Sequence, residues 1–326
     1  MIPHDLSDCH ANVTVVIVNW NGERFLDRCL SALLAQTVAP HEIILVDNAS
    51  SDASLTIVQR FPTVRLLAQN ENLGFARGNN LAIEAASAES GWIALLNPDA
   101  FPEPCWLEAL LSAARDYPAF DVFGSKLLNA ADPAILDGAG DAYHISGRVW
   151  RIGRGERVSF VSEQAHEVFS PCAAAAMYRR SALLEVGGFD EDYFCYVEDV
   201  DLGFRLRLAG YRCLYVPSSV AHHVGSGTTG GQHSDFAVYH GHRNLVWTYV
   251  KDMPGVLFWA FLPLHLVMNL AALLVFTLRG QGGVMFRAKR DAVLGLPKMW
   301  AKRRQVQSNR VVSWRAILRV MAKGLR

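Results

Sequence analysis

Two kinds of hydrophobic pattern alternate along the first third of the chain. Continuous apolar runs rich in β-branched residues predict buried parallel strands. These runs cover residues 13–19, 42–46, 64–68 and 92–96. Between them, apolar residues recur every three or four positions, which predicts helices over residues 23–36, 52–60, 78–88 and 103–115. This alternation favours an α/β fold with a doubly wound, mainly parallel sheet.

The middle of the chain has a less regular pattern. Short strands are expected near residues 119–125, 173–178 and 211–216, and helices over 200–209 and 236–251. Glycines are frequent between the first two of these strands, which predicts a section rich in loops.

Polar clusters follow each of the first four predicted strands. They are Asn19-Trp20-Asn21-Gly22, Asp47-Asn48-Ala49-Ser50, residues 70–80 and Asn97-Pro98-Asp99. In an open parallel sheet, ligands bind beyond the carboxyl ends of the strands. One such cluster could be an ordinary capped turn. Four clusters on one edge predict a crevice lined with hydrogen-bonding and acidic groups.

The charge of the 326-residue chain is zero overall but unevenly distributed. Residues 279–326 contain thirteen basic residues and one acid, so they carry a formal charge of +12 and the rest of the chain carries −12. The six cysteines form no C-x-x-C pair, so we expect reduced thiols rather than a zinc site or a disulfide framework. The polar first ten residues do not resemble a signal peptide, and we expect the body to be cytoplasmic.

Several motifs resemble a known family, in order and spacing. The segments VVIVNWNG, VDNASSD, NLGFARGNN and LLNPDA are similar to the nucleotide-binding half of family 2 glycosyltransferases with the GT-A fold. The later segment from Pro171 to Pro217 resembles the acceptor half, and the likeness is strongest to rhamnosyltransferase-like members. The resemblance implies a donor half over 11–125 and an acceptor half over 126–254. The apolar run and the basic charge of the remaining residues predict a helical, basic, membrane-associating segment over 255–326.

The same resemblance implies roles for individual residues in binding the sugar nucleotide. Asp47 would contact the nucleobase, and the strand-end cluster after it would lie nearby. The full set of expected donor-binding residues is Asn19, Asp47, Asn48, Ser50, Gly74, Arg77, Asn80 and Asn97.

A divalent cation is expected as cofactor. A sugar nucleotide leaves as a diphosphate, and Mg²⁺ or Mn²⁺ held by a carboxylate and phosphate oxygens neutralises the developing charge. Asp99 stands where the family has the last acid of its D-x-D motif, while Asn97 replaces the first acid. His222 is the further expected ligand, because the family often has a histidine there.

Inverting transfer also requires a carboxylate that accepts the proton of the acceptor hydroxyl. Glu198-Asp199-Val200-Asp201 opens a predicted helix, whose amino terminus favours anionic groups. By resemblance to the family's ED motif, Asp199 is the expected base, and Glu198 and Asp201 position it or the acceptor. Simple capping of the helix by acids is the alternative.

These expectations combine into one hypothesis of function. The chain is expected to be an inverting glycosyltransferase that moves a hexose or deoxyhexose, rhamnose in particular, from a dTDP- or UDP-sugar to a lipid-linked or cell-surface glycan precursor. No nucleic-acid partner is expected. The alternatives are a sugar nucleotidyltransferase and a catalytically inactive protein that binds nucleotide sugars.

The apolar run over residues 256–278 is long enough to span a bilayer. Pro263, His265 and Asn269 disfavour a span, and the basic tail would have to cross against the positive-inside tendency. We therefore expect a peripheral or monotopic segment on the anionic, cytoplasmic face of the inner membrane. An interfacial helix from Trp314 to Leu325 would add to this contact. A soluble helical hairpin is the alternative.

Overall fold

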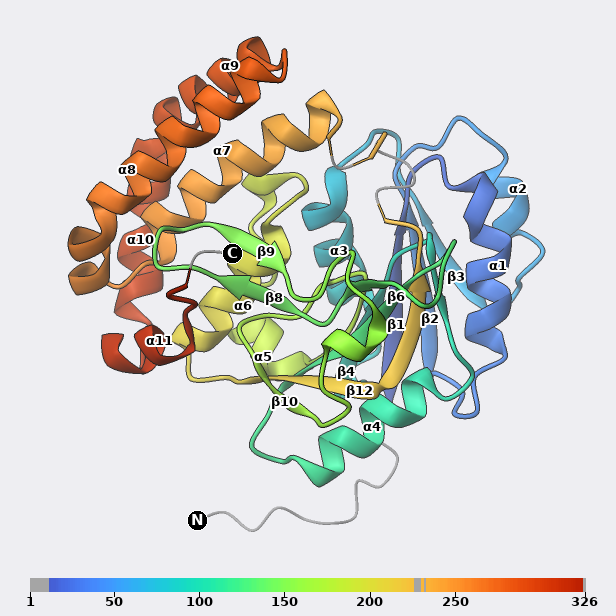
Figure 1. Cartoon of the computed structure of the whole chain (residues 1–326). Coiled ribbons are helices and arrows are strands. Elements are labelled where there is room, and N and C mark those ends of the chain that lie inside the picture. The colour runs from blue at the N-terminus through green and yellow to red at the C-terminus, as the bar shows by residue number, and fades with distance from the viewer. Residues whose placement is uncertain (1–11, 226–229, 232, 325–326) are drawn as a thin grey trace.

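The computed structural model describes residues 12–225, 230–231 and 233–324. These residues form an α/β body with a group of helices packed at one side (Figure 1). Within them, one sheet of ten strands has the order β10-β12-β6-β11-β4-β1-β2-β3, with β5 paired to β12 and β7 to β6. Its strands are β1 (Val13–Asn19), β2 (Glu42–Asp47), β3 (Val64–Ala68), β4 (Trp92–Leu96), β5 (Ala100–Pro102), β6 (Val122–Asn129), β7 (Leu136–Gly138), β10 (His166–Val168), β11 (Ala175–Arg179) and β12 (Cys213–His223).

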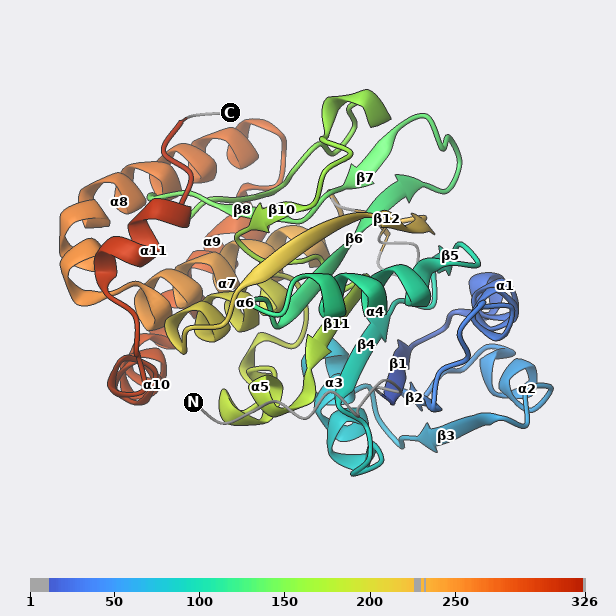
Figure 2. The same cartoon turned by 90° about the horizontal axis from the view of Figure 1, so that it is seen from below.

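Helices cover both faces of this sheet, as Figure 2 shows from below. The helices of the α/β body are α1 (Glu23–Leu34), α2 (Ser54–Val58), α3 (Gly74–Ala85), α4 (Trp106–Asp116), α5 (Arg180–Glu185) and α6 (Glu198–Leu208). Alternate side chains of a strand point to opposite faces. Val15 and Ile17 of β1 therefore join a core with α1 and α4, whereas Val16 and Val18 join a second core with α3. Burial of both faces explains why the strands are continuous apolar runs.

The expected doubly wound, mainly parallel sheet is confirmed. Strands β3, β2, β1 and β4 are parallel neighbours, and β6 is parallel to β12. β11 is antiparallel to both of its neighbours, β4 and β6, and joins the two parallel groups into one sheet. The expected division at residue 125 falls inside β6, so the two halves share this sheet; the division itself remains a prediction, and its start at residue 11 lies outside the described residues.

Several element boundaries differ from the pattern-based expectation. Helix α3 begins at Gly74 rather than near residue 78, because the turn before it is closed by Asn72, whose Oδ1 accepts from the Gly74 amide. Strand β12 continues to His223 instead of ending at residue 216, because a bulge between Val216 and Val220 lets it pair along the whole of β6. The section rich in loops also contains a hairpin of β8 (Asp141–Tyr143) and β9 (Val149–Arg151), and the short helices η1 (Val158–Phe160) and η2 (Glu191–Tyr193) follow later in the chain.

Five helices complete the described chain and form a separate apolar cluster against α6 and the β8–β9 hairpin. They are α7 (Asp235–Asp252), α8 (Gly255–Leu278), α9 (Gly282–Leu294), α10 (Leu296–Ser308) and α11 (Trp314–Val320). The cluster includes Tyr143, Phe204, Trp247 and Met299. Helix α7 lies against both α9 and α10, and α8 packs on α9 (Figure 1).

The expectation of an interfacial helix from Trp314 to Leu325 was wrong for the described part. Helix α11 ends at Val320, and Leu325 lies outside the described residues. Ile317 and Met321 are buried in the helical cluster, so their apolar side faces the protein. The apolar side chains that the pattern predicted would contact lipid pack against the body instead.

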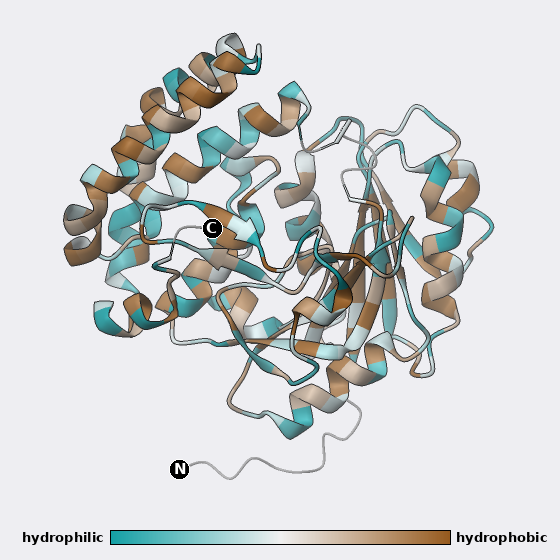
Figure 3. Cartoon of the chain, viewed as in Figure 1, coloured by the Kyte–Doolittle hydropathy of each residue, from teal (hydrophilic) through white to brown (hydrophobic). Residues whose placement is uncertain are grey.

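Helix α8 is long and apolar enough to cross a membrane, by length and composition alone. It continues through Pro263, and His265 and Asn269 face the body. The His265 ring stacks on Tyr249 at 3.9 Å between ring centroids and donates from Nδ1 to the Ser146 carbonyl oxygen over 2.7 Å. The outer face carries exposed apolar side chains along its length, seen as brown bands in Figure 3.

Candidate active site

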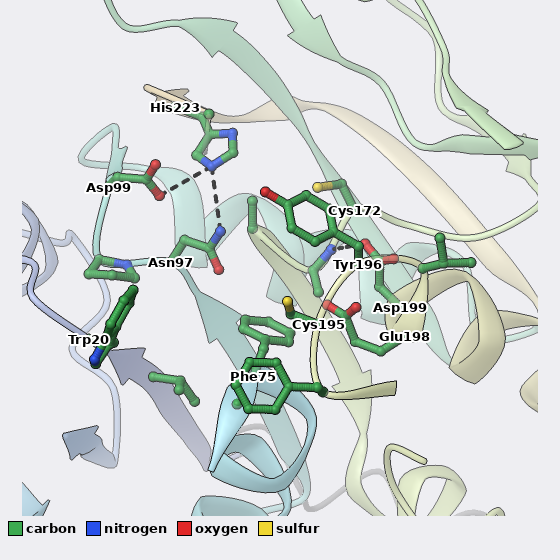
Figure 4. Close-up of a pocket in the computed structure, with 18 of the residues that line it drawn as sticks. Trp20, Phe75, Asn97, Asp99, Cys172, Cys195, Tyr196, Glu198, Asp199 and His223 are labelled. Carbon is green, nitrogen blue, oxygen red and sulfur yellow. Dashed lines mark hydrogen bonds and ion pairs between the residues drawn. The ribbon is translucent and has the colours of Figure 1, made fainter. Parts of the chain in front are cut away.

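A cavity of about 520 Å³ lies at the carboxyl ends of β1, β2 and β4. Its walls come from both expected halves of the chain (Figure 4). Of the residues expected from sequence, it is lined by Asn48, Gly74, Asn97, Asp99, Glu198 and Asp199. Asn19, Asp47, Ser50, Arg77, Asn80, Asp201 and His222 are not among its lining residues.

Asn19, Asp47 and Ser50 form a hydrogen-bonded network behind the cavity. Asn19 Nδ2 donates to Asp47 Oδ2 over 2.8 Å, and Ser50 Oγ donates to the same oxygen over 2.7 Å. The Ser50 amide donates to Asp47 Oδ1 over 2.9 Å. Both carboxylate oxygens of the buried Asp47 are therefore engaged. The network fixes the turns after β1 and β2, which carry the lining residues Trp20 and Asn48.

Asn48 and Gly74 lie together on the cavity wall. Asn48 Nδ2 donates to the Gly74 carbonyl oxygen over 3.1 Å, which orients the amide, while Asn48 Oδ1 has no partner among the described residues. Gly74 has a φ of +79°, and a Cβ there would lie 2.5 Å from the Phe194 ring. Only glycine fits this position, because an added side chain would be strained and would collide with the opposite half.

Arg77 and Asn80 contact the acceptor half instead of the cavity. The Arg77 side chain is half exposed and lies 3.9 Å from Glu191 Oε2. Asn80 donates to the Phe189 carbonyl oxygen over 2.9 Å and accepts from the Phe189 amide over 2.8 Å. Asn80 thus holds the turn at Gly188–Phe189 against α3.

His223, rather than His222, lies beside Asp99. His223 Nε2 is 3.3 Å from Asp99 Oδ1 and 3.5 Å from Asn97 Nδ2, as Figure 4 shows. His222 points the other way and lies 3.1 Å from Glu103 Oε1 near the surface. Both histidines are in β12, and neighbouring residues of a strand face opposite sides. The sequence expectation had placed the wrong member of the pair next to Asp99.

A buried carboxylate orients His223 from behind. Asp137 Oδ2 lies 2.7 Å from His223 Nδ1 and also accepts from Arg151 Nη1 over 2.9 Å. Arg154 Nη2 is 3.3 Å from Asp137 Oδ1. Although burial disfavours the charged ring, the carboxylates of Asp99 and Asp137 raise the pKa of His223 to about 9. The His223 ring therefore lies between two acids, one at each of its nitrogens.

Glu198 and Asp199 occupy the opposite wall, at the amino terminus of α6 (Figure 4). Asp199 Oδ1 accepts from the Val200 amide over 2.8 Å, and Oδ2 accepts from the Ala173 amide over 3.3 Å. Burial raises the pKa of both carboxyls above the ordinary range, while Arg151 opposes the rise at Asp199. A carboxylate with a raised pKa is a stronger base than an exposed one.

Asp201 has a structural role in the described fold. It is fully buried, Arg205 Nε donates to its Oδ2 over 2.9 Å, and the Lys251 ammonium pairs with its other oxygen. Lys251 also pairs with Asp190, which ties α7 to the chain before η2. Asp201 is two residues beyond Asp199, which turns its side chain by about 200° around the helix, away from the cavity and into this ion network.

Sequence reasoning missed several lining residues. They are Trp20, Phe75, Arg151, Arg154, Cys172, Phe194, Cys195, Tyr196 and His223. Trp20 and Phe75 are part of the motifs VVIVNWNG and NLGFARGNN, so their position in these motifs could have identified them as lining residues. Arg151 and Arg154 lie in and after the β8–β9 hairpin, which the pattern described only as loops. The cysteines that the structure describes, Cys172 and Cys195 among them, are free thiols, as expected.

The described residues contain no group of three or more histidine, cysteine, aspartate or glutamate side chains arranged around a metal. The pair Asp99–His223 supplies one carboxylate and one imidazole facing the cavity.

Comparison with known proteins relates this arrangement to one family. The profile described as "Glycosyl transferase family 2" matches residues 14–187, and "Glycosyl transferase family group 2" matches residues 144–281. The N-acetylglucosaminyl-diphospho-decaprenol L-rhamnosyltransferase of Mycobacterium tuberculosis is 34% identical over 251 residues, covering 69% of this chain and 80% of that protein. Rhamnosyltransferase WbbL of Escherichia coli is 27% identical, covering 65% of this chain and 83% of WbbL.

Solved structures agree on the fold. The mannosyltransferase PcManGT from Pyrobaculum calidifontis, solved with GDP-Man and Mn²⁺, superposes with a TM-score of 0.54 at 18% identity and covers 95% of this chain and 86% of its own. The family match makes the sugar nucleotidyltransferase alternative untenable. With the GT-A sheet, the cavity at its carboxyl edge and the family match over more than half of its length, the chain belongs to glycosyl transferase family 2 and is a glycosyltransferase.

Proposed function

We propose that this enzyme transfers a deoxyhexose, with rhamnose as the first candidate, from a dTDP- or UDP-sugar to a hydroxyl of a lipid-linked glycan precursor, with inversion at the anomeric carbon. Two relatives carry rhamnosyl transfer in their names, and one of those names specifies a diphospho-decaprenol acceptor. Single-step inversion needs one base on the acceptor side and charge neutralisation on the leaving-group side.

The observation that carries this proposal is the placement of two acidic sites on opposite walls of one cavity. Asp99 lies with His223 on one wall, and Asp199 lies on the other (Figure 4). A donor whose diphosphate lies beside Asp99 would have its sugar directed toward Asp199. An acceptor hydroxyl between sugar and carboxylate would then attack in line with the departing diphosphate.

The Asp99–His223 pair fits a divalent cation that completes its ligand shell with diphosphate oxygens and water. Asp137 accepts from His223 Nδ1, which leaves Nε2 as the nitrogen that faces the cavity. A carboxylate behind a histidine is the usual support of a metal-binding imidazole. Mg²⁺ or Mn²⁺ at this place would neutralise the diphosphate as it leaves. We therefore assign the proposed ligands to Asp99 and His223 and withdraw His222.

Asp199 is the proposed base. The amides of Ala173 and Val200 hold its two oxygens in place, and the start of α6 stabilises the carboxylate form. Burial raises its pKa, which strengthens its affinity for the acceptor proton. Glu198 lies beside it and lines the same wall.

Asn48 is the proposed contact for the nucleobase edge. Its Nδ2 donates to Gly74, and its buried Oδ1, which has no partner among the described residues, is the proposed acceptor for the base. Uracil and thymine both present an imide N–H that such an acceptor recognises. The proposed role shifts from the buried Asp47 to Asn48, and it favours a UDP- or dTDP-sugar without choosing between them.

The proposed location is the cytoplasmic face of an anionic membrane, where a lipid-linked acceptor would be reached. Support comes from the outer face of α8, whose apolar side chains are exposed, whereas His265 and Asn269 face the body. These exposed side chains include Val256, Trp259, Leu266, Leu270 and Leu274. A helix that already packs one face on the protein fits a position in the membrane interface better than a span.

Transfer assays with the purified full chain test the proposal. UDP-sugars and dTDP-rhamnose are offered with a polyprenyl-diphosphate-linked N-acetylglucosamine, with Mg²⁺, Mn²⁺ or EDTA, and products are identified by mass spectrometry. Transfer of rhamnose, with inverted configuration by NMR, is expected. Transfer of another sugar would overturn the donor assignment. Tight binding of a sugar nucleotide without transfer to any acceptor would favour the inactive binding protein.

A further inference from the structure

Three residues with left-handed backbone angles occur within four positions just before the proposed base. Phe194, Tyr196 and Val197 have φ values of 64°, 64° and 70°. None is a glycine, and Val197 is β-branched, so the conformation is unfavourable for each. Such residues persist only when the surroundings hold them in place. The segment ends directly at Glu198-Asp199, so it determines where the two carboxylates lie.

The surroundings that hold this segment come mainly from two neighbouring residues of α7. Asn244 Nδ2 donates toward three carbonyl oxygens, those of Tyr193 at 3.1 Å, Cys195 at 2.9 Å and Tyr196 at 2.7 Å. Arg243 Nη2 donates to the Tyr193 carbonyl over 3.0 Å and to that of Asp192 over 3.2 Å.

Asn244 is itself held in place. It is fully buried, and its Oδ1 accepts from Arg243 Nε over 2.9 Å. This bond orients the amide, so that both of its hydrogens point to the strained segment. An amide nitrogen has two hydrogens, so three acceptors must share them. The side chain thus uses its whole donor capacity on carbonyls next to the proposed base.

The donor half supplies the remaining contact. The Phe194 carbonyl oxygen accepts from the amides of Phe75 and Ala76, at 2.7 and 3.1 Å, at the amino terminus of α3. Gly74 touches the Phe194 ring, and Asn48 binds Gly74. The segment 193–197 is therefore fixed between α7 and the donor wall of the cavity.

We propose that Asn244 is a positioning residue for transfer: by holding segment 193–197 in its left-handed conformation, it sets the place of Asp199 without touching either substrate. This inference rests on the proposed role of Asp199 as base. Loss of the clamp lets the strained residues relax to negative φ, which moves Glu198 and Asp199 relative to the cavity. Donor binding, which uses the opposite wall, stays intact.

The test compares Asn244→Asp with the wild-type full chain. Aspartate has the same size but presents acceptors where three carbonyls need donors. The expected result is a fall in kcat of about 10²-fold, the scale of a misplaced reacting group. The Kd for UDP or dTDP, measured by calorimetry, is expected to stay unchanged. Hydrogen exchange by mass spectrometry is expected to show faster exchange in residues 193–199.

Arg303→Met is the matched control. Arg303 also donates from a buried side chain to backbone carbonyls, those of Val250 and Met253. These carbonyls lie at the carboxyl-terminal end of α7, away from segment 193–197. It is expected to lower the midpoint of thermal unfolding without accelerating exchange at 193–199. A comparable fall in kcat in this control would show that general loosening of the helices is sufficient, and would overturn the positioning role.

Other outcomes decide as clearly. Wild-type kcat in Asn244→Asp, or loss of nucleotide binding in step with kcat, contradicts the proposal. If Asn244→Asp does not fold, Asn244→Ser replaces it. Hydrogen exchange at 193–199 and a kcat that both equal the wild-type values in that variant would refute the positioning role of Asn244. Absence of transfer by the wild-type chain on every acceptor would instead count against the proposed function, while the exchange arm would still report on the clamp.

Discussion

His222 and His223 are adjacent in the chain, yet they occupy opposite environments. One lies near the surface beside Glu103, and the other is buried between Asp99 and Asp137. At the residue scale, the chemistry of this site depends on which of two neighbouring side chains a strand turns inward. In helix α6, the direction of the side chain likewise separates Asp199, which lines the cavity, from Asp201, which does not.

The histidine pair offers a matched test of the proposed metal site. His223→Ala is expected to weaken Mn²⁺-dependent binding of a nucleoside diphosphate by at least about tenfold, the lower end for loss of a metal ligand or its support. His222→Ala is expected to leave it unchanged, because that ring does not line the cavity. Calorimetric titrations with and without Mn²⁺ measure both. Equal effects of the two substitutions would contradict the assignment.

Asp199→Asn is expected to reduce transfer by about 10²–10⁴-fold, the usual contribution of a general base. Nucleotide binding should survive, since the base acts on the acceptor. In the wild type, burial raises the pKa of Asp199, so activity should fall with decreasing pH at values above the ordinary aspartate range of about 3.9. The pH profile of kcat and the Kd for UDP are the measurements. Near-normal turnover in the variant would eliminate Asp199 as base.

At the scale of single elements, α8 separates its polar and apolar residues more completely than its sequence indicates. Its helical hydrophobic pattern is nearly uniform, but packing against the body gives it one inner and one outer face. The inner face includes His265, and the outer face includes Leu270 and Leu274, which are 66% and 61% exposed. An apolar surface of this kind marks an interaction site.

Leu270→Glu combined with Leu274→Glu is expected to abolish binding to vesicles containing anionic lipid. Two charges on the outer face oppose insertion, whereas the contacts of the inner face remain. Co-sedimentation at low salt measures the effect. Leu184→Glu, at an exposed apolar residue of α5, is the control and should bind as the wild type does. Unchanged sedimentation of the double variant would refute α8 as the contact.

At the scale of the whole molecule, the uneven charge of the chain serves folding as well as location. Lys298 pairs with Asp192, and Lys302 pairs with both Asp190 and Asp192. Part of the +12 tail therefore neutralises acids of the acceptor half. The expectation that the tail serves an anionic surface holds only for the part of its charge that remains outward, and membrane binding itself remains a proposal.

Lys251→Met is expected to lower the free energy of unfolding by about 3 kcal/mol, the lower end for breaking a buried ion pair, because Asp190 and Asp201 each keep one other cation. Urea denaturation at neutral pH measures the loss. The cations hold the pKa of Asp190 below its usual range. The stability that the ionised Asp190 carboxylate contributes is therefore present above about pH 3.9 and is lost as the pH falls toward its pKa in the folded protein. Equal stability of the variant and the wild type at neutral pH would contradict this role.

The topology of the tail is the remaining prediction at this scale. A cysteine introduced at Gly324 should resist an impermeant thiol reagent in intact cells and react after lysis, because the outer face of α8 is expected to lie in the membrane without crossing it. Labelling from outside would establish a span. Recovery of the whole protein in the soluble fraction at low salt would favour the helical hairpin.

The sequence by itself determined that the first four strands form a parallel sheet and at which edge of that sheet polar groups collect. Periodicity carries that information locally, because burial on both faces of a strand requires an apolar run. Asn48, Gly74, Asn97, Asp99, Glu198 and Asp199 were expected as site residues because the motifs that contain them resemble those of family 2 glycosyltransferases, and all six line the cavity.

Only the tertiary structure decided which neighbour faces the cavity and what supports it. His223 lies in the part of β12 that follows the bulge, where it pairs with Asn129 of β6. Arg151 reaches the site through a hairpin far along the chain, and Asn244 through a helix that follows the matched motifs. The tail helix α11 turned inward because apolar surface of the body was available to it. These outcomes depend on contacts between segments distant in sequence, which no local pattern encodes.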